Sequence, residues 1–331
     1  MILLWAGLAH ALDHHVLHEG ETLLDVAQAE GVPVGALRAL NRLAAKDLPP
    51  VGTVLLLPGA ESSEPAAIVL SVSGTGTAAL PGEAAVPLST TRALPVGTLV
   101  CTDHGGHATL RLATAPNSHE HDDVTMLGGT CLTLDASWAR DERRASVVSV
   151  RRGSIAVLAA AEGTGAVTVR TGASVSTSTT GGFRVTVEEG ASRTEALDGA
   201  VEVMGAGAQV SLTEGTATRV RDGEAPAAPV ALLAAGAPRY PNEKTPLRRP
   251  DFAWAPVDRA LGYRVEIAST PDFTTIVLAE DVGSSPWRPE TLFLPFDEGA
   301  LWWRISSFDR TGFLGAPSVP ARIVLPVGVG P

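Results

Sequence analysis

Residues 15–58, HVLHEGETLLDVAQAEGVPVGALRALNRLAAKDLPPVGTVLLLP, decide the fold of the first part of the chain. A short strand, His15–Leu17, precedes Thr22, which is placed to N-cap a helix because apolar residues follow it at helical spacing. A glycine is expected to end this helix, and a second amphipathic run then carries leucines on one face before a pair of prolines. The strand Val54–Leu57 closes the stretch. The pattern predicts one small β-α-α-β module.

This module resembles the LysM family, whose members bind the N-acetylglucosamine backbone of peptidoglycan or chitin. At three positions the chain departs from the usual family core, because His15 replaces a tyrosine, Leu17 a valine and Glu21 an aspartate. The residues that match the core are Gly20, Thr22, Leu23, Asn41, Gly52, Leu55, Leu57 and Pro58. The resemblance implies a glycan-binding module over residues 12–60.

The LysM family holds its glycan between the loop after the first strand and the loop before the second strand. Backbone groups in such loops can bind the acetamido substituents, while apolar side chains pack on the flat faces of the sugars. The resemblance therefore assigns glycan binding to Gly20, Glu21, Thr22, Leu23, Leu48, Pro49, Pro50 and Val51. Alternatively, the leucines of the module only form its core, and the module keeps the fold without binding a glycan.

The composition of the whole chain favours a mainly β, multidomain protein. The sequence has 331 residues, enough for two or three domains, and its 34 Gly, 24 Pro and 5% aromatic residues suit short strands and many turns. A net charge of −11 argues against a nucleic-acid partner, because phosphate contacts need a basic face.

The first 11 residues form an apolar run that ends in Ala9-His10-Ala11, which has the small-x-small form of a signal-peptidase site. The run lacks a basic start and is too short to span a bilayer, so we interpret it as the end of a secretory signal. An N-terminal extension of the folded protein is the alternative. No other segment is long and apolar enough to predict a membrane span, and we expect a periplasmic or secreted, cell-wall-associated protein.

Alternating apolar and small polar residues fill residues 67–222, after a polar linker at 61–66. This period of two, interrupted by glycines, predicts an antiparallel β sandwich or roll. The segments that carry a further resemblance are, in order, LPVGTLVCT, HATLRL, VTMLGGTCLTL, VVSVRRGSIAV, EALDGAVEV and VSLTEGTATRV. Their layout is similar to that of the periplasmic β domain of the FecR family.

The resemblance to FecR implies a domain fold and a periplasmic location. The family usually carries an arginine-glycine-threonine-x-phenylalanine motif, whereas this chain has Thr179-Thr180-Gly181-Gly182-Phe183. Founding members pass a signal through a membrane helix to a sigma factor, and because this sequence shows no such helix, the signalling role does not carry over. FecR-like domains also occur beside LysM modules as scaffolds or interaction domains, with an envelope protein as a candidate partner.

The two cysteines, Cys101 and Cys131, lie in β-like runs separated by 30 positions. In an oxidising compartment they could join adjacent strands and add ~2–4 kcal/mol to the stability of the domain. Alternatively, both are buried free thiols that pack as small hydrophobic residues. The sequence leaves the two possibilities open.

A Pro- and Ala-rich stretch at 223–249 is expected to be a linker before a compact domain at 250–331. The segments PDFAWAPVDRALGYRVEIASTPDF and GALWWRISSFDRTGFLGAPS resemble fibronectin type III-like β-sandwiches of bacterial surface proteins. Trp254 and one of Trp302 and Trp303 are expected to fill the core, because alternation turns the other indole outward.

One histidine constellation could bind a metal ion, namely His104 and His107 together with His119 and His121. Three imidazoles from neighbouring strands suit zinc. The polar, glycine-flanked sequence around the second pair instead favours a solvated hairpin tip, so we predict no metal site and no cofactor. We also find no nucleophile paired with a base and no phosphate-binding loop, and we therefore predict that the protein is not an enzyme.

These observations predict a non-enzymatic envelope protein in which a LysM module tethers FecR-like and fibronectin-like interaction domains to peptidoglycan or another N-acetylglucosamine polymer. A weak sugar contact, multiplied by the repeats of the wall, would localise the protein. Alternatives are a periplasmic sensor of the FecR type acting through a protein partner, and an enzyme accessory or cell-wall hydrolase.

Overall fold

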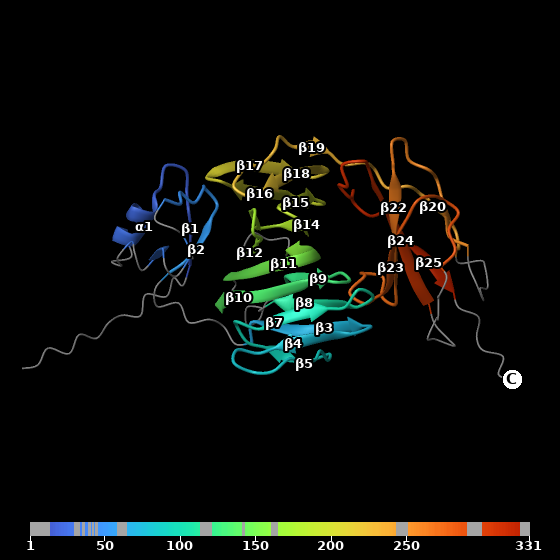
Figure 1. Ribbon diagram of the computed structural model, residues 1–331, viewed down its shortest axis with the longest axis horizontal. Helices are drawn as coiled ribbons and strands as arrows, with labels where there is room; N and C mark the ends of the chain where they lie inside the picture. The colour runs from blue at the N-terminus through green and yellow to red at the C-terminus, as the bar shows by residue number, and fades with distance from the viewer. Residues whose placement is uncertain are drawn as a thin grey trace, which may run out of the picture.

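The computed structural model describes residues 14–29, 34, 37–38, 41, 43, 46–57, 65–112, 121–140, 143–159, 165–242, 251–289 and 300–324. They form an N-terminal module (residues 14–57), a middle domain (residues 65–231) and a C-terminal domain (residues 236–324). Figure 1 shows the middle domain between the other two. Strands in several sheets dominate the described residues, which confirms the prediction of a mainly β, multidomain protein.

The N-terminal module pairs β1 (His14–Val16) with β2 (Val54–Leu56) in an antiparallel ribbon beside α1 (Leu23–Ala29). Val34, Leu37 and Arg38 are also helical, where the second helix was expected. The expected end of the first helix at Gly31 lies outside the described residues. The buried apolar side chains of the module are Leu17, Leu23, Val26, Ala27, Leu37, Leu55 and Leu57.

The middle domain consists of two sheets that share one long strand. Its strands are β3 (Ala67–Ser73), β4 (Gly76–Ala79), β5 (Val86–Pro87), β6 (Ala93–Leu94), β7 (Leu99–Thr102), β8 (His107–Leu112), β9 (Asp123–Met126), β10 (Cys131–Arg140), β11 (Arg143–Ala159), β12 (Gly165–Arg170), β13 (Val175–Ser178), β14 (Gly181–Glu188), β15 (Ala191–Ala196), β16 (Ala200–Gly205), β17 (Ala208–Thr213), β18 (Thr216–Arg221) and β19 (Val230–Ala231).

What we call the first sheet contains β4, β5, β7, β10, β12, β13, β16 and β17, and the second sheet contains β3, β6, β8, β9, β14, β15, β18 and β19. Buried side chains from both sheets form one core between them. The pairing is antiparallel, as expected, apart from β11 and β12, which run parallel.

The shared strand β11 leaves the first sheet and enters the second at Gly153. Residues before it pair with β10, whereas Gly153 and the residues after it pair with β14. Gly153 has a φ of +85°, and a Cβ at this position would lie 2.5 Å from the Cα of Thr130. Only glycine accepts both conditions, so this residue allows the strand to turn from one sheet into the other.

Cys101 and Cys131 lie directly opposite each other on β7 and β10 of the first sheet. Their Cα atoms are 4.2 Å apart, and the two sulfur atoms are bonded. Of the two possibilities that the sequence leaves open, the structure therefore contains the disulfide.

The C-terminal domain pairs β20 (Pro238–Tyr240) with β21 (Ala253–Trp254), and a four-stranded sheet has the order β23 (Ile276–Val282), β22 (Gly262–Ala268), β24 (Ala300–Phe308), β25 (Ala321–Val324). Trp254 and Trp303 are fully buried, whereas Trp302 is partly exposed, which confirms the prediction of one inward and one outward indole. The stretch 223–249, expected to be a linker, supplies β19 to the middle domain and β20 to the C-terminal domain.

The C-terminal domain packs against the second sheet of the middle domain. Arg184 and Glu195, which are direct cross-strand neighbours on β14 and β15, both contact the backbone of Leu314. The Arg184 Nη1 donates to the Leu314 carbonyl at 3.0 Å, and the Leu314 N–H donates to Glu195 Oε1 at 3.3 Å. On β8, Thr109 Oγ1 donates to the carbonyl of Thr274 at 2.7 Å. Among the described helices, none is long and apolar enough to cross a membrane.

Candidate functional site

The loop that enters α1 is fixed by a reciprocal pair of hydrogen bonds between Thr22 and Asp25. The Asp25 N–H donates to Thr22 Oγ1 at 3.2 Å, and the Thr22 N–H donates to Asp25 Oδ2 at 2.8 Å. This is a capping box, in which a residue before the helix and one in its first turn satisfy each other's backbone donors. The hydrogen bonds from Thr22 hold the pKa of Asp25 below its usual value. Thr22 is thus the N-cap that the sequence predicts.

Glu21 fastens the same loop to β1. Its Oε2 lies 2.7 Å from Nε2 of His15 and accepts a 3.0 Å hydrogen bond from the N–H of His18. The hydrogen bond with His15, followed by that with the His18 backbone, lowers the pKa of Glu21. His15 and Glu21 are two of the positions at which the chain departs from the usual LysM core, and the structure brings these two replacements into contact. The pair therefore stabilises the loop in one shape.

A groove of about 400 Å³ opens between this loop and the loop before β2. Its lining residues are Glu21, Thr22, Leu23, Leu24, Val34, Arg38, Leu48 and Pro49. Leu24 is 52% exposed and Leu48 is 75% exposed, so two leucines on opposite walls present apolar surface to solvent. Arg38 Nη1 donates to the carbonyl of Asp47 at 2.9 Å and so ties the second loop to the helical segment. Apolar walls with a few polar groups are suited to a sugar ring, which has an apolar face and a polar edge.

Five of the eight residues that the sequence assigns to glycan binding line this groove. Gly20, with a φ of +80°, lies in the turn that precedes them rather than in the lining. Pro50 and Val51 lie at the contact with the middle domain, where they face a small hollow next to Val175 and Glu202. The second loop therefore has two sides, one toward the groove and one toward the middle domain.

Three lining residues, Leu24, Val34 and Arg38, were not among those assigned from sequence. The sequence pattern around Leu24 could have identified it as a residue of the groove. Leu23, Val26 and Ala27 define the buried side of α1, so helical spacing places Leu24 away from the core. A single exposed leucine is ordinary, but Leu24 lies in the same groove as the exposed Leu48, and together they form an apolar surface that a ligand can cover.

The sequence of this module matches a family model. The model is described as LysM domain, and it covers residues 15–58. Residues 15–58 are a LysM domain. The groove lies between the two loops from which the family binds its glycan, and the LysM domain therefore brings its expected binding loops together in this chain.

Comparisons of the remaining chain are weaker. No curated protein matches the sequence. Two crystal structures of a proposed anti-sigma factor from Parabacteroides distasonis share 18% and 17% identity with the chain at a TM-score of 0.33, over 40% of this chain and 59% of theirs. The FN1–FN3 domains of chicken CNTN1 share 9% identity at a TM-score of 0.18, over 80% of this chain and 99% of theirs. TM-scores this low do not establish a common fold.

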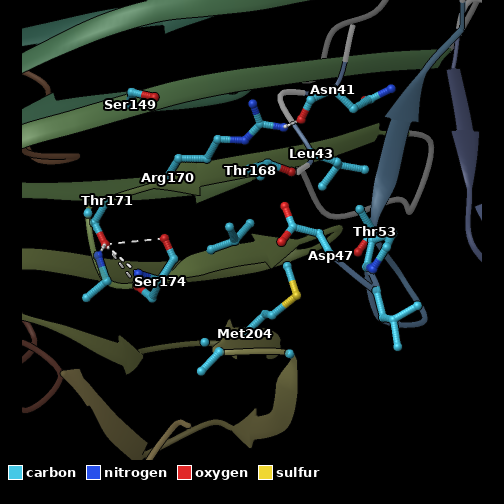
Figure 2. A pocket seen from close by; sticks show the side chains of 18 of the residues that line it. Asn41, Leu43, Asp47, Thr53, Ser149, Thr168, Arg170, Thr171, Ser174 and Met204 are labelled. Carbon is cyan, nitrogen blue, oxygen red and sulfur yellow. Dashed lines mark hydrogen bonds between the residues drawn. The ribbon is translucent and has the colours of Figure 1, made fainter. Parts of the chain in front are cut away.

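A second cavity, of about 510 Å³, lies between the LysM domain and the first sheet of the middle domain (Figure 2). The LysM domain contributes Asn41, Leu43, Lys46, Asp47, Leu48, Pro49 and Thr53, and the middle domain contributes Ser149, Thr168, Arg170–Val175 and Met204–Gly207. We call this cavity the interdomain cleft. Figure 2 shows Arg170 extending across it toward Asn41, whose carbonyl accepts a 3.3 Å hydrogen bond from Arg170 Nη2.

The structure describes three of the four histidines that could bind a metal ion, namely His104, His107 and His121. His119 lies outside the described residues. His107 is buried, and burial lowers the pKa of its imidazole. Within the part of the chain that the structure describes, no group of three or more His, Cys, Asp or Glu side chains could hold a metal ion.

Proposed function

We propose that this protein is a non-enzymatic, cell-wall-associated protein that binds peptidoglycan or another N-acetylglucosamine polymer through its LysM domain. The observation that carries the proposal is the groove between the two loops, with Leu24 and Leu48 exposed on its walls, whereas Leu17, Leu23, Leu37, Leu55 and Leu57 are buried in the core. Its entrance loop is held by the capping box and by Glu21, so little ordering is needed when a sugar binds.

The middle and C-terminal domains act, in this proposal, as interaction domains that the LysM domain holds at the envelope. The FecR-like order of segments and the apolar N-terminal run support a periplasmic or secreted location. The disulfide between Cys101 and Cys131 supports the same location, because such bonds persist in oxidising compartments.

A pulldown with insoluble peptidoglycan tests the proposal, with Leu24→Ser as the groove variant. Leu24 is about half exposed, and a bound sugar would cover that exposed half of its surface, worth ~1 kcal/mol or roughly fivefold in affinity. The matched control is Leu261→Ser, an equally conservative change at a 64% exposed leucine in the C-terminal domain. Only the groove variant is expected to shift from the pellet to the supernatant. Equal sedimentation of the two variants would contradict the proposal.

The non-enzymatic part of the proposal needs its own measurement. Prolonged incubation of the intact protein with purified peptidoglycan is expected to release neither reducing sugars nor soluble fragments, with a muramidase as the positive control. Release above the level of a heat-denatured sample would show that the protein hydrolyses its ligand.

A FecR-type regulator remains the second candidate, favoured by the order of segments in residues 67–222. In that function the middle domain would recognise a protein partner. The LysM domain contacts the first sheet and the C-terminal domain contacts the second, and Ile68 and Leu158 of the second sheet stay exposed as surface that a partner could cover. Co-purification of one stoichiometric envelope protein, unchanged by Leu24→Ser, would favour this function over tethering.

A further inference from the structure

We propose that the interdomain cleft continues the LysM groove and binds further sugar units of the same N-acetylated amino-sugar chain. The middle domain would then form part of the glycan-binding site. This inference rests on the proposed function, since it requires that the groove itself binds the glycan.

The two cavities are continuous. Leu48 and Pro49 line both the groove and the interdomain cleft. Leu48 is 75% exposed, more than any other leucine of the LysM domain whose side chain the structure describes, and it lies where the two cavities meet. A glycan longer than the groove that leaves it on this side would pass over Leu48 and enter the cleft.

The lining of the cleft combines apolar and polar groups. Leu43, Val175 and Met204 are partly exposed and apolar, whereas Lys46, Asp47 and Thr171 supply exposed or partly exposed polar groups. The hydroxyls of Thr168 and Ser174 are buried and hydrogen-bonded within the middle domain. Figure 2 shows the apolar side chains of Leu43 and Met204 near the polar side chain of Asp47, so both kinds of group face the cleft. A sugar ring needs both kinds, because its axial hydrogens form an apolar face and its hydroxyl and acetamido groups form a polar edge. The volume of about 510 Å³ falls within the ~300–1,000 Å³ of ordinary ligand sites.

The lining of the cleft carries little net charge. Its charged residues are Lys46, Asp47 and Arg170, two cations and one anion, and Arg170 already donates to the carbonyl of Asn41. So small a net charge suits an uncharged sugar better than a strongly acidic or basic ligand, such as a stem peptide of peptidoglycan with its several carboxylates.

Direct contacts hold the two walls of the cleft at a defined distance from each other. Arg170 joins the walls through Asn41, and Pro50–Thr53 face β13 and β16 across a small hollow. A cleft that already exists before binding adds contacts without an additional ordering cost. Sugar units in the cleft would therefore strengthen the weak contact made by a single LysM groove.

The test uses the intact protein, isothermal titration calorimetry, and the trimer and hexamer of N-acetylglucosamine. The cleft variant is Gly172→Tyr, because Gly172 is exposed in the lining and an added Cβ would meet only Asp222, at 3.8 Å. Gly172→Ala tests the backbone change alone. Gly283→Tyr is the matched control in the C-terminal domain, where an added Cβ would meet nothing within 4 Å.

For the unchanged protein we expect the hexamer to bind at least ~10-fold more tightly than the trimer. Gly172→Tyr is expected to abolish most of this gain while trimer binding stays the same, and both Gly172→Ala and Gly283→Tyr are expected to retain it. A gain that survives in Gly172→Tyr would overturn the inference and leave the proposed function intact. Failure of the trimer to bind any of the proteins would instead overturn the proposed function. A gain seen only with fragments that carry stem peptides would show that the cleft binds peptide, which also contradicts the inference.

Discussion

Removing the positive charge of Arg184 should destabilise the contact between the middle and C-terminal domains. Arg184 is 4% exposed and Glu195 is fully buried, and both bind the backbone of Leu314. In Arg184→Met the Leu314 carbonyl loses its donor and Glu195 loses its cross-strand counter-charge. Breaking a buried pair of charges from one side typically costs ~3–5 kcal/mol of the free energy of unfolding.

The pH dependence of this loss has a definite sign. Burial raises the pKa of Glu195 in the native protein, against the opposing charges of Arg184 and Arg193. A group whose native pKa is raised contributes stability below its unfolded pKa, near 4.5, and that contribution is lost as the pH rises through the native value. Removal of Arg184 raises the native pKa of Glu195 further. The variant should therefore be most destabilised near neutral pH and recover in mild acid.

Urea unfolding followed by tryptophan fluorescence measures the effect, because Trp254 and Trp303 are buried in the C-terminal core. The matched control is Arg288→Met, which breaks a pair with Asp251 that is about half exposed, screened by solvent and expected to change the free energy of unfolding little. The double variant Arg184→Met with Glu195→Met should cost ~1–3 kcal/mol less than the sum of the single variants. Additive losses, or equal losses in Arg184→Met and Arg288→Met, would refute the reasoning.

Three further predictions concern the LysM domain and the disulfide. Replacing Cys101 and Cys131 by alanine should lower the free energy of unfolding by ~3–4 kcal/mol, the entropy of closing a loop of this length, as measured by urea unfolding of oxidised and variant protein. Equal midpoints would contradict it. Thr22→Ala should cost ~1 kcal/mol in the stability of the LysM domain, whereas Thr22→Ser should cost little; hydrogen exchange of α1 amides distinguishes them. Because the native pKa of Glu21 is lowered, its stabilisation of the loop is present above its unfolded pKa of about 4.5 and should be lost as the pH falls through the native value. The His18 amide resonance should shift over that acidic range in the unchanged protein and not in Glu21→Gln.

The fold of each part could be predicted from sequence because the signals are local. Thr22 and Asp25 are three residues apart, and the capping box they form depends only on the chain around them. Alternation likewise predicted the sandwich of the middle domain, because each strand must turn one row of side chains toward a core. The sequence alone does not decide whether the disulfide forms, since no local pattern sets the distance between two cysteines that are 30 residues apart.

The contacts between the parts could not be predicted, because they use side chains that local rules assign to solvent. Arg184 alternates with Phe183 and Val185 on β14, so its position alone indicates a solvated outer face. The structure buries it because a turn distant in sequence, around Leu314, covers that face. Arg170 on β12 is another case, since its partner Asn41 belongs to the LysM domain. The interdomain cleft was missed for the same reason, as its two walls come from separate modules.

These contacts change what a glycan tether would accomplish. The LysM domain packs on the first sheet of the middle domain, and the C-terminal domain packs on the second. A flexible chain would let the C-terminal domain explore a large volume around its anchor. Packing on both faces instead fixes the C-terminal domain relative to the LysM groove, so that a bound wall polymer also sets the position of Trp302 and its surroundings. The two functions are then separable: Arg184→Met should loosen the C-terminal domain without weakening glycan binding, whereas Leu24→Ser should weaken glycan binding without loosening the C-terminal domain.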